Sequence, residues 1–357
     1  MEYKLLGRSG LRVSELCLGT MTFGEDWGWG ANKKESREIF DLFVQRGGNF
    51  VDTADGYTNG TSEKMLGEFV GPDRSRFVIS TKYSFNQRPG DPNAGGNHRK
   101  NMVQALEGSL KRLQMDYVDV YIVHAWDQLT PIEEVMRAMD DVVRAGKVLY
   151  AAVSNLPAWL IACANVLAEM RGWTPFINMQ IEYSLIERTP ERELLPMAQA
   201  LDIGVTAWSP LASGILSGKY TSGKKSEPKR LEKADFKELS ERNLTIARAV
   251  QKVADLLGRS PAQVALNWVR QRGNIIPIIG ARTAEQMRDN LACLEFTLSP
   301  PEMQLLDEAS KIEMGYPHDF LQRESVHERL HGGTFDKIRN HRVRTEMETE
   351  ERPGKVA

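Results

Sequence analysis

Residues 98–124, HRKNMVQALEGSLKRLQMDYVDVYIVH, combine two kinds of secondary structure in one stretch. The first part carries a single apolar stripe at helical spacing, formed by Met102, Leu106, Leu110 and Leu113. The second part, VDVYIVH (118–124), is almost continuously apolar, which is typical of a strand buried on both faces of a parallel sheet. The stretch therefore predicts a helix that leads into a buried parallel strand.

The same alternation of strand and helix recurs about eight times along the chain. Further strand-like runs lie at 15–20, 49–54, 77–82, 148–155, 176–180, 204–210 and 275–280. Further helical patterns lie at 33–46, 61–70, 131–145, 157–171, 190–201, 242–258, 261–272 and 283–293. Such units form either a closed (β/α)8 barrel or an open doubly wound sheet. An open sheet usually carries G-x-G-x-x-G after its first strand, and this sequence has no such run. We therefore predict an α/β fold of the (β/α)8 TIM-barrel type.

Three segments stand outside this repeat. Residues 2–13 resemble a β-hairpin that turns at GRSG and covers the bottom of the barrel. Residues 219–241 are heavily charged and poor in apolar side chains, which predicts a mobile loop near the site. The tail, 332–357, is polar, and we expect no regular structure in it. We expect one barrel domain over 1–320 and a polar extension over 321–357 that is disordered or makes an oligomer contact.

The composition argues against several classes of function. The chain has 357 residues and a formal net charge of −2, so nothing favours nucleic acid or an anionic membrane surface as a partner. No apolar run approaches the ~18 residues of a membrane span, and the N-terminus lacks the pattern of a secretory signal. Cys17, Cys163 and Cys293 stand far apart, which favours buried or inert thiols in a reducing compartment. The expected location is the cytoplasm.

The ends of the predicted strands carry polar or reactive side chains. In a (β/α)8 barrel, reactive groups stand at the C-terminal ends of strands or in the loops just beyond. From the second predicted strand onward, those ends hold Asp52 with Tyr57 five residues later, Lys82, His124, Ser154 with Asn155, Gln180, Trp208 with Ser209, and Gly280 to Arg282. We therefore expect these groups to meet at one rim.

Asp52, Tyr57, Lys82 and His124 together suggest proton-transfer chemistry. A buried lysine needs a carboxylate partner, and Asp52 is the nearest candidate. Lys82 would then lie near the Tyr57 hydroxyl and favour its phenolate, so that Tyr57 gives a proton to a carbonyl oxygen. His124 would orient that carbonyl. Taken singly, each residue has an ordinary structural explanation, such as a salt bridge or a turn tyrosine. Their convergence on three adjacent strands favours catalysis, and because none of the four supplies a hydride, a cofactor is required.

Longer stretches of the chain resemble the aldo-keto reductase superfamily. The similarity runs through LGRSGLRVSELCLGTMTFG (6–24), NFVDTADGYTNGTSEKMLGEFV (49–70), LEGSLKRLQMDYVDVYIVH (106–124), WSPLASGILSGKY (208–220) and IIPIIGARTAEQMRDNL (275–291). It covers roughly residues 1–310, with the motifs in the family's order. The resemblance is closest to the branch that includes bacterial general stress reductases and potassium-channel β-subunits.

This resemblance implies NADPH as hydride donor, bound extended across the rim without a Rossmann domain. It also implies the roles given above for the four catalytic residues, a carboxamide site at Ser154, Asn155 and Gln180, and stacking of Trp208 on the nicotinamide. The implied cofactor-binding set is Gly19, Thr20, Met21, Asp52, Ser154, Asn155, Gln180, Trp208, Ser209, Pro210, Leu211, Ser213, Gly214, Lys219, Gly280, Arg282, Gln286 and Asn290. Arg282, with Arg288 as a helper, suits a ribose 2′-phosphate.

Aromatic side chains surround the expected mouth of the site. We expect substrate contacts from Phe23, Trp27, Tyr57, Tyr83, Phe85, His124 and Trp126, with Trp29 nearby. Such a lining suits an apolar or aromatic carbonyl compound as the small-molecule partner. Neither a nucleic acid nor a membrane partner is expected, and the chain is compatible with a monomer or a homo-oligomer.

Two other functions remain open. One is an NADP-binding regulatory subunit with little turnover, although the chain has no long segment before the first hairpin and keeps all four catalytic residues. The other is a metal-dependent barrel hydrolase, which would need clusters of His or carboxylate at several strand ends. Only Asp52 and His124 are available for that purpose, so we expect no metal site.

Overall fold

The computed structural model describes residues 1–220 and 239–339. The chain divides into two compact units, Met1–Lys311 and Ile312–Ala357. Within the described ranges, no helix is both long enough and apolar enough to cross a membrane. The expected mobile loop at 219–241 lies almost entirely outside the described residues.

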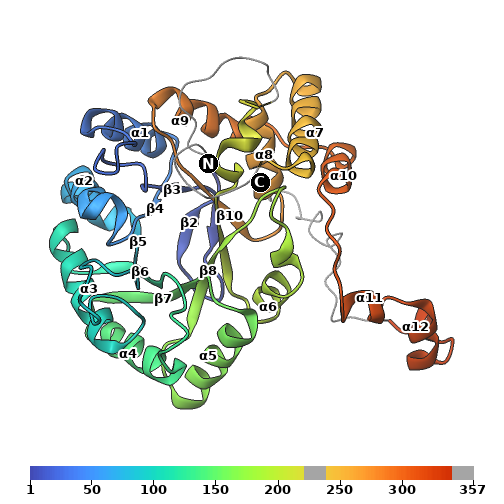
Figure 1. Ribbon diagram of the computed structural model, residues 1–357, viewed down its shortest axis with the longest axis horizontal. Helices are drawn as coiled ribbons and strands as arrows, with labels where there is room; N and C mark the ends of the chain where they lie inside the picture. Colours follow the sequence, from blue (N-terminus) through green and yellow to red (C-terminus); the bar gives the residue numbers. More distant parts are fainter. Residues whose placement is uncertain (221–238, 340–357) are drawn as a thin grey trace, which may run out of the picture. The chain divides into compact units, whose positions relative to one another are not determined.

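The first unit is a closed barrel of eight parallel strands (Figure 1). The strands are β3 (Cys17–Gly19), β4 (Phe50–Asp52), β5 (Val78–Tyr83), β6 (Val118–Val123), β7 (Val148–Ser154), β8 (Phe176–Glu182), β9 (Gly204–Trp208) and β10 (Ile275–Ile279). They follow one another in chain order, and β10 closes the barrel against β3. The predicted (β/α)8 fold is confirmed.

Helices surround this barrel. They are α1 (Lys33–Gln45), α2 (Thr61–Val70), α3 (Arg99–Leu113), α4 (Ile132–Arg144), α5 (Ala158–Arg171), α6 (Leu194–Ala200), α7 (Glu241–Leu257), α8 (Pro261–Arg270), α9 (Ala284–Leu291) and α10 (Pro300–Ala309). Short 3-10 segments are η1 (Tyr57–Gly60), η2 (Gly71–Arg76), η3 (Thr189–Glu191), η4 (Ala212–Ser217) and η6 (Ala292–Glu295).

Two helical regions differ from the sequence expectation. The helix expected over 190–201 is divided into η3 and α6, and α6 begins at Leu194, which leaves Pro196 in its first turn, where a missing N–H is tolerated. Helix α10 was not expected at all. Its start carries a capping box in which Ser299 and Glu302 bind each other's backbone N–H groups, a signal that the sequence does contain.

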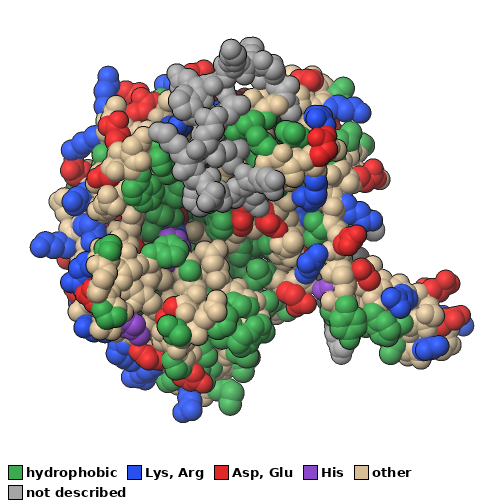
Figure 2. All heavy atoms as spheres, in the orientation of Figure 1, with side chains coloured by type: hydrophobic (Ala, Val, Ile, Leu, Met, Phe, Trp, Pro, Cys, Tyr) green, Lys and Arg blue, Asp and Glu red, His purple; other side chains and the backbone are tan. Residues whose placement is uncertain are grey.

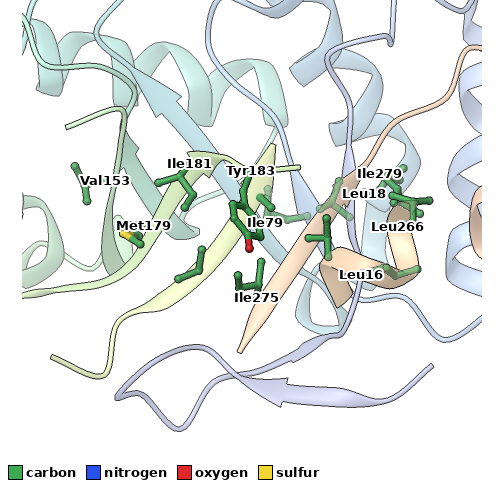
Figure 3. Close-up of a cluster of buried hydrophobic side chains, with 14 of the residues drawn as sticks. Leu16, Leu18, Ile79, Val153, Met179, Ile181, Tyr183, Leu266, Ile275 and Ile279 are labelled. Atoms are coloured by element: carbon green, nitrogen blue, oxygen red, sulfur yellow. The ribbon is translucent and has the colours of Figure 1, made fainter. Parts of the chain in front are cut away.

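The apolar core has two layers, because successive side chains of a strand point to opposite faces. Inside the barrel lie Leu6, Val13, Cys17, Phe50, Val78, Val120, Ile122, Ala152, Ile177, Ile276 and Ile278. Between strands and helices lies a larger cluster, part of which is drawn in Figure 3 with Ile79, Met179 and Ile275 on the strands and Leu266 on α8.

The N-terminal hairpin of β1 (Tyr3–Leu5) and β2 (Arg12–Ser14) closes the bottom of the barrel. Its Leu6 and Val13 belong to the inner cluster. Gly7 is required at the turn because its φ is +56° and a Cβ there would lie 2.2 Å from the carbonyl oxygen of Ile177. The hairpin predicted at this end is therefore confirmed, and the opposite end is left open for a site.

The second unit contains α11 (His318–Leu321), α12 (Glu324–His331) and η7 (Phe335–Lys337). The short η7 segment lies inside 332–357, where we expected no regular structure; beyond residue 339 that region is outside the described residues. The separation into a 1–320 domain and a 321–357 extension stays a prediction. All three cysteines are free; Cys17 and Cys293 are buried, whereas Cys163 on α5 is exposed.

Candidate active site

Three adjacent strands bring the four predicted catalytic residues to one rim. Asp52 ends β4, Lys82 lies next to the end of β5, and His124 directly follows β6. Tyr57 begins η1, in the loop between β4 and α2. Because the strands are parallel and in register, their C-terminal ends lie at the same end of the barrel. In Figure 2 a histidine is visible among hydrophobic side chains near the centre of the molecular face.

Lys82 is the centre of this arrangement. Its side chain is fully buried, and Nζ donates to Asp52 Oδ2 at 2.6 Å, to the carbonyl oxygen of Thr53 at 2.7 Å and to Tyr57 Oη at 3.1 Å. These three bonds use all three protons of the ammonium group. Burial by itself would lower the pKa of Lys82, but the charges of Asp52 and Tyr57 outweigh burial and raise that pKa. Lys82 therefore remains a cation beside the Tyr57 hydroxyl.

Asp52 is held on both of its carboxylate oxygens. While Oδ2 accepts from Lys82, Oδ1 accepts from Ser80 Oγ at 2.8 Å and from Gln180 Nε2 at 3.0 Å. The bond from Gln180 crosses from β8 to β4 and was not expected from the sequence, which suggested only a cofactor contact for this residue. The sequence does contain a signal for the contact between Ser80 and Asp52. Residues two apart on a strand share a face, and Ser80 precedes Lys82 by two.

His124 presents a neutral imidazole to the site. Its ring centroid lies 6.0 Å from that of Tyr57, almost perpendicular, and 4.4 Å from that of Phe85. Burial, followed by the nearby charge of Lys82, holds the pKa of His124 well below its usual value. A neutral imidazole has one N–H donor and one acceptor nitrogen, so His124 has one proton with which to orient a carbonyl oxygen.

Two buried polar atoms at neighbouring strand ends have no hydrogen-bond partner among the described residues. They are His124 Nδ1 and Ser154 Oγ. Close to them, Asn155 Nδ2 donates to the carbonyl oxygen of His124 at 2.9 Å, and Trp208 Nε1 donates to Asn155 Oδ1 at 3.3 Å. Buried polar atoms normally find a partner. These two polar atoms and the half-buried Trp208 fit the amide and ring of a nicotinamide.

The loop after β9 has an unusual backbone. Ser209, Ala212, Ser213 and Gly214 all have positive φ. Ser209 Oγ accepts the backbone N–H of Ser213 at 3.2 Å. The N–H groups of Ala212 and Gly214 also donate within the loop, to the carbonyl oxygens of Ser209 and Leu211. Pro210 is buried here, Leu211 is half-buried and Lys219 is exposed. Because these N–H groups are used inside the loop, the diphosphate contact expected here stays a prediction, with Lys219 as the cation that the loop offers.

The loop between β10 and α9 carries Arg282, which is half-buried. Two residues of the implied cofactor-binding set hold this loop: Gln286 Oε1 accepts the N–H of Arg282 at 2.9 Å, and Asn290 Nδ2 donates to the carbonyl oxygen of Gly280 at 3.1 Å. Glu35 accepts the N–H of Ala284, so the N-terminus of α9 already has a carboxylate partner. The role expected of Arg282 toward a 2′-phosphate therefore stays a prediction for its side chain and does not involve the helix end.

The loop after β3 holds Gly19, Thr20 and Met21. A Cβ on Gly19 would lie 2.7 Å from Ile278 Cγ2, so this position needs glycine for packing. Thr20 is fully buried, and its Oγ1 donates to the carbonyl oxygen of Asp52 at 3.1 Å. The side chain of Thr20 thus supports the loop that carries the site, and Met21 is half-buried beside it.

The predicted aromatic mouth is present only in part. Phe85 is 52% exposed, and Trp27 is 37% exposed and packs on Trp29 with ring centroids 5.6 Å apart. Trp126 is half-buried and meets Trp159 of α5 edge to face at 6.0 Å, a contact the sequence did not suggest.

Phe23 and Tyr83 do not line the mouth, and the expectation for these two is corrected. Both are fully buried. Phe23 packs edge to face on Phe69. Tyr83 stacks on Tyr121 and donates its hydroxyl proton to the carbonyl oxygen of Asn97. The reason for Tyr83 is strand alternation: Lys82 points into the barrel, so its neighbour must point outward toward the helices.

Comparison with known proteins places the chain in a family. The family model for the aldo/keto reductases matches residues 15–311. The chain is a member of the aldo/keto reductase family. It is therefore an oxidoreductase of a family that uses nicotinamide cofactors and acts on carbonyl groups.

The relatives of this aldo/keto reductase cover most of its length. An uncharacterized oxidoreductase of Bacillus subtilis is 39% identical over 86% of the chain and 95% of its own length. An aryl-alcohol dehydrogenase of Pestalotiopsis microspora is 35% identical over 90% of the chain and 85% of its own length. An aryl-alcohol dehydrogenase [NADP(+)] of Phanerodontia chrysosporium is 33% identical over 92% of the chain and 91% of its own length.

Proposed function

We propose that this protein reduces an aldehyde or ketone to an alcohol, with hydride from NADPH and a proton from Tyr57. The observation that carries this proposal is the buried Lys82, which donates at once to Asp52 and to Tyr57. Lys82 is the donor in its hydrogen bond to Tyr57 Oη, so that bond does not use the proton of the Tyr57 hydroxyl group. Tyr57 can direct it toward an acceptor in the site.

Each of the four side chains has a separate role in this reaction. Asp52 keeps Lys82 charged, and Lys82 stabilises negative charge on Tyr57 Oη as the proton leaves. The neutral His124 donates a second hydrogen bond to the substrate oxygen and holds it near Tyr57. The bound nicotinamide would supply the hydride, held by the carboxamide contacts of Ser154 and Asn155 and by the ring of Trp208.

The choice of NADPH over NADH rests on Arg282. A guanidinium group forms paired hydrogen bonds with a phosphate, which NADH lacks at the ribose 2′ position. Arg288, exposed on α9, is the second cation proposed for this phosphate. The name of the Phanerodontia chrysosporium relative, which specifies NADP(+), supports this choice.

The substrate proposed is an apolar or aromatic carbonyl compound. Phe85 and Trp27 present exposed ring surface, and Trp126 adds a half-buried ring two residues after His124. Such rings stack on flat apolar groups. Two of the relatives described above are named aryl-alcohol dehydrogenases, which agrees with this lining.

The test is NADPH oxidation over a panel of aldehydes, ketones, quinones and sugars, run with wild-type protein and Tyr57→Phe. We expect turnover of aryl aldehydes by the wild type and a loss of at least about 100-fold in kcat for the variant, the usual size of a general-acid contribution. NADPH affinity, followed by fluorescence, should be unchanged. Full turnover by Tyr57→Phe would refute the proton-donor role, and tight NADPH binding without turnover of any substrate would favour a regulatory subunit.

A further inference from the structure

Asp55 is a buried carboxyl group that the mechanism above does not use. It lies in the loop between β4 and η1, two residues before Tyr57, and it is 4% exposed. Its backbone N–H donates to the carbonyl oxygen of Lys82 at 3.1 Å, so the chain here follows the end of β5. Its Oδ1 is buried without a hydrogen-bond partner in the described part of the chain. Leaving a buried carboxylate oxygen unpaired is costly, which calls for an explanation.

The charged groups around Asp55 already form ion pairs with one another. Glu63 of α2 is fully buried; its Oε2 accepts from Arg112 Nε of α3 at 2.6 Å, and its Oε1 accepts from Thr81 Oγ1 of β5 at 2.6 Å. Lys82 is paired with Asp52. The buried Lys82 and the partly buried Arg112 thus balance two carboxylates, and Asp55 is a third carboxyl without an ion pair in the described part of the chain.

One further titratable group, the phenol of Tyr121 on β6, faces Asp55. Its hydroxyl donates to the carbonyl oxygen of Met102, and burial holds its pKa well above the usual value, so it stays uncharged. Burial, and then the negative charge of Glu63, raise the pKa of Asp55 to about 7 against the opposing effects of Arg112, the Gly56 N–H and Lys82. Asp55 therefore gains and loses its proton in the neutral range.

We propose that Asp55 is a positioning residue whose negative charge keeps the Lys82–Tyr57 pair protonated as the solution becomes alkaline. When Asp55 loses its proton, the buried region behind the rim gains one uncompensated negative charge close to Lys82. That charge stabilises the ammonium group and opposes formation of the phenolate. Tyr57 then holds its proton, and remains a competent donor, to a higher pH. This inference rests on the proposed function, because it takes Tyr57 as the donor.

The experiment compares the pH dependence of kcat/KM for carbonyl reduction in wild type and Asp55→Asn. The charge of Lys82 lowers the pKa of Asp55, and by reciprocity the Asp55 charge raises the proton affinity of Lys82. Between unit charges in a partly buried site such an interaction amounts to on the order of one pK unit. We therefore expect the alkaline fall of kcat/KM to begin roughly one pH unit lower in Asp55→Asn, with activity at pH 6 nearly unchanged. Asp55→Glu should restore the wild-type profile. Asp140→Asn is the matched control, since Asp140 is a buried carboxylate paired with Arg144 on α4, and it should leave the profile in place.

A second measurement does not depend on turnover. Difference infrared spectra of the protein at pH 6 and pH 8 should contain the band of a protonated carboxyl group that titrates near neutral pH. The band should be absent in Asp55→Asn and displaced in Asp55→Glu; if Asp55→Asn does not fold, the displacement in Asp55→Glu decides. An unchanged alkaline limb in folded Asp55→Asn, or no titrating band in wild type, overturns the proposal. Failure of the Tyr57 role would appear separately, as full turnover by Tyr57→Phe.

Discussion

Replacing Lys82 by methionine tests the central ion pair of the site. Methionine keeps most of the length of the side chain but removes the ammonium group. Asp52 Oδ2 then loses its 2.6 Å bond, and the carbonyl oxygen of Thr53 loses a donor. Asp52 keeps only the two neutral donors on Oδ1, Ser80 and Gln180. A carboxylate that is 3% exposed is thereby left without a cation.

The size of the effect follows from that uncompensated charge. Removing one partner of a buried ion pair costs about 3–5 kcal/mol of unfolding free energy, more than the pair itself is worth. The double variant Lys82→Met/Asp52→Asn should recover most of this loss, because an amide can still accept from Ser80 and Gln180 without a buried charge. Activity should be lost in both variants, since Tyr57 then has no adjacent cation.

The assay is urea unfolding followed by circular dichroism at pH 7 and pH 5. In wild type, the raised pKa of Lys82 means that its contribution to stability is complete below the ordinary lysine value of ~10.4 and is lost only as pH rises above it. Lys82 therefore adds no pH dependence to the free energy of unfolding between pH 5 and pH 7. A loss of unfolding free energy below about 1 kcal/mol in Lys82→Met, or no recovery in the double variant, would refute this account of the site.

Three further predictions concern other parts of the chain. Gly67→Ala should destabilise the protein by about 1–3 kcal/mol, because the new Cβ would lie 2.3 Å from the carbonyl oxygen of Leu113 where α2 meets α3; Gly10→Ala, with open space around it, is the control, and equal unfolding midpoints would contradict the prediction. Arg282→Ala should weaken NADPH binding about 10- to 100-fold and leave NADH binding unchanged, with a smaller effect for Arg288→Ala; an unaltered preference for NADPH in a binding titration would show the assignment to be wrong. Asp55 has its pKa raised to about 7, so the stability it contributes is complete below the ordinary Asp pKa of about 4 and is lost between about pH 4 and pH 7, by on the order of 4 kcal/mol. Thermal unfolding of Asp55→Asn should lack this decline, and parallel curves for the two proteins would count against it.

The sequence alone predicted the barrel and the rim. Strands covered on both faces read as continuous apolar runs, and that local property does not depend on the rest of the fold. The polar residue at each strand end could also be read directly, because parallel strands carry their C-terminal ends to one side. For this reason Asp52, Lys82 and His124 can be predicted from the sequence, and the capping box at Ser299 is a further local signal, for the start of α10.

Only the tertiary structure decided what those side chains touch. Gln180 donates to Asp52 across the barrel, and Glu63 of α2 pairs with Arg112 of α3. Asp55 has no counterion among the described residues. Such pairings join residues far apart in the chain, and no local pattern encodes which donor finds which acceptor. Burial acts in the same way, since the side chains packed around Asp55 and His124 set the direction of each pKa. Residue types and strand order are therefore local properties of this sequence, whereas the charge state of its site is a property of the closed barrel.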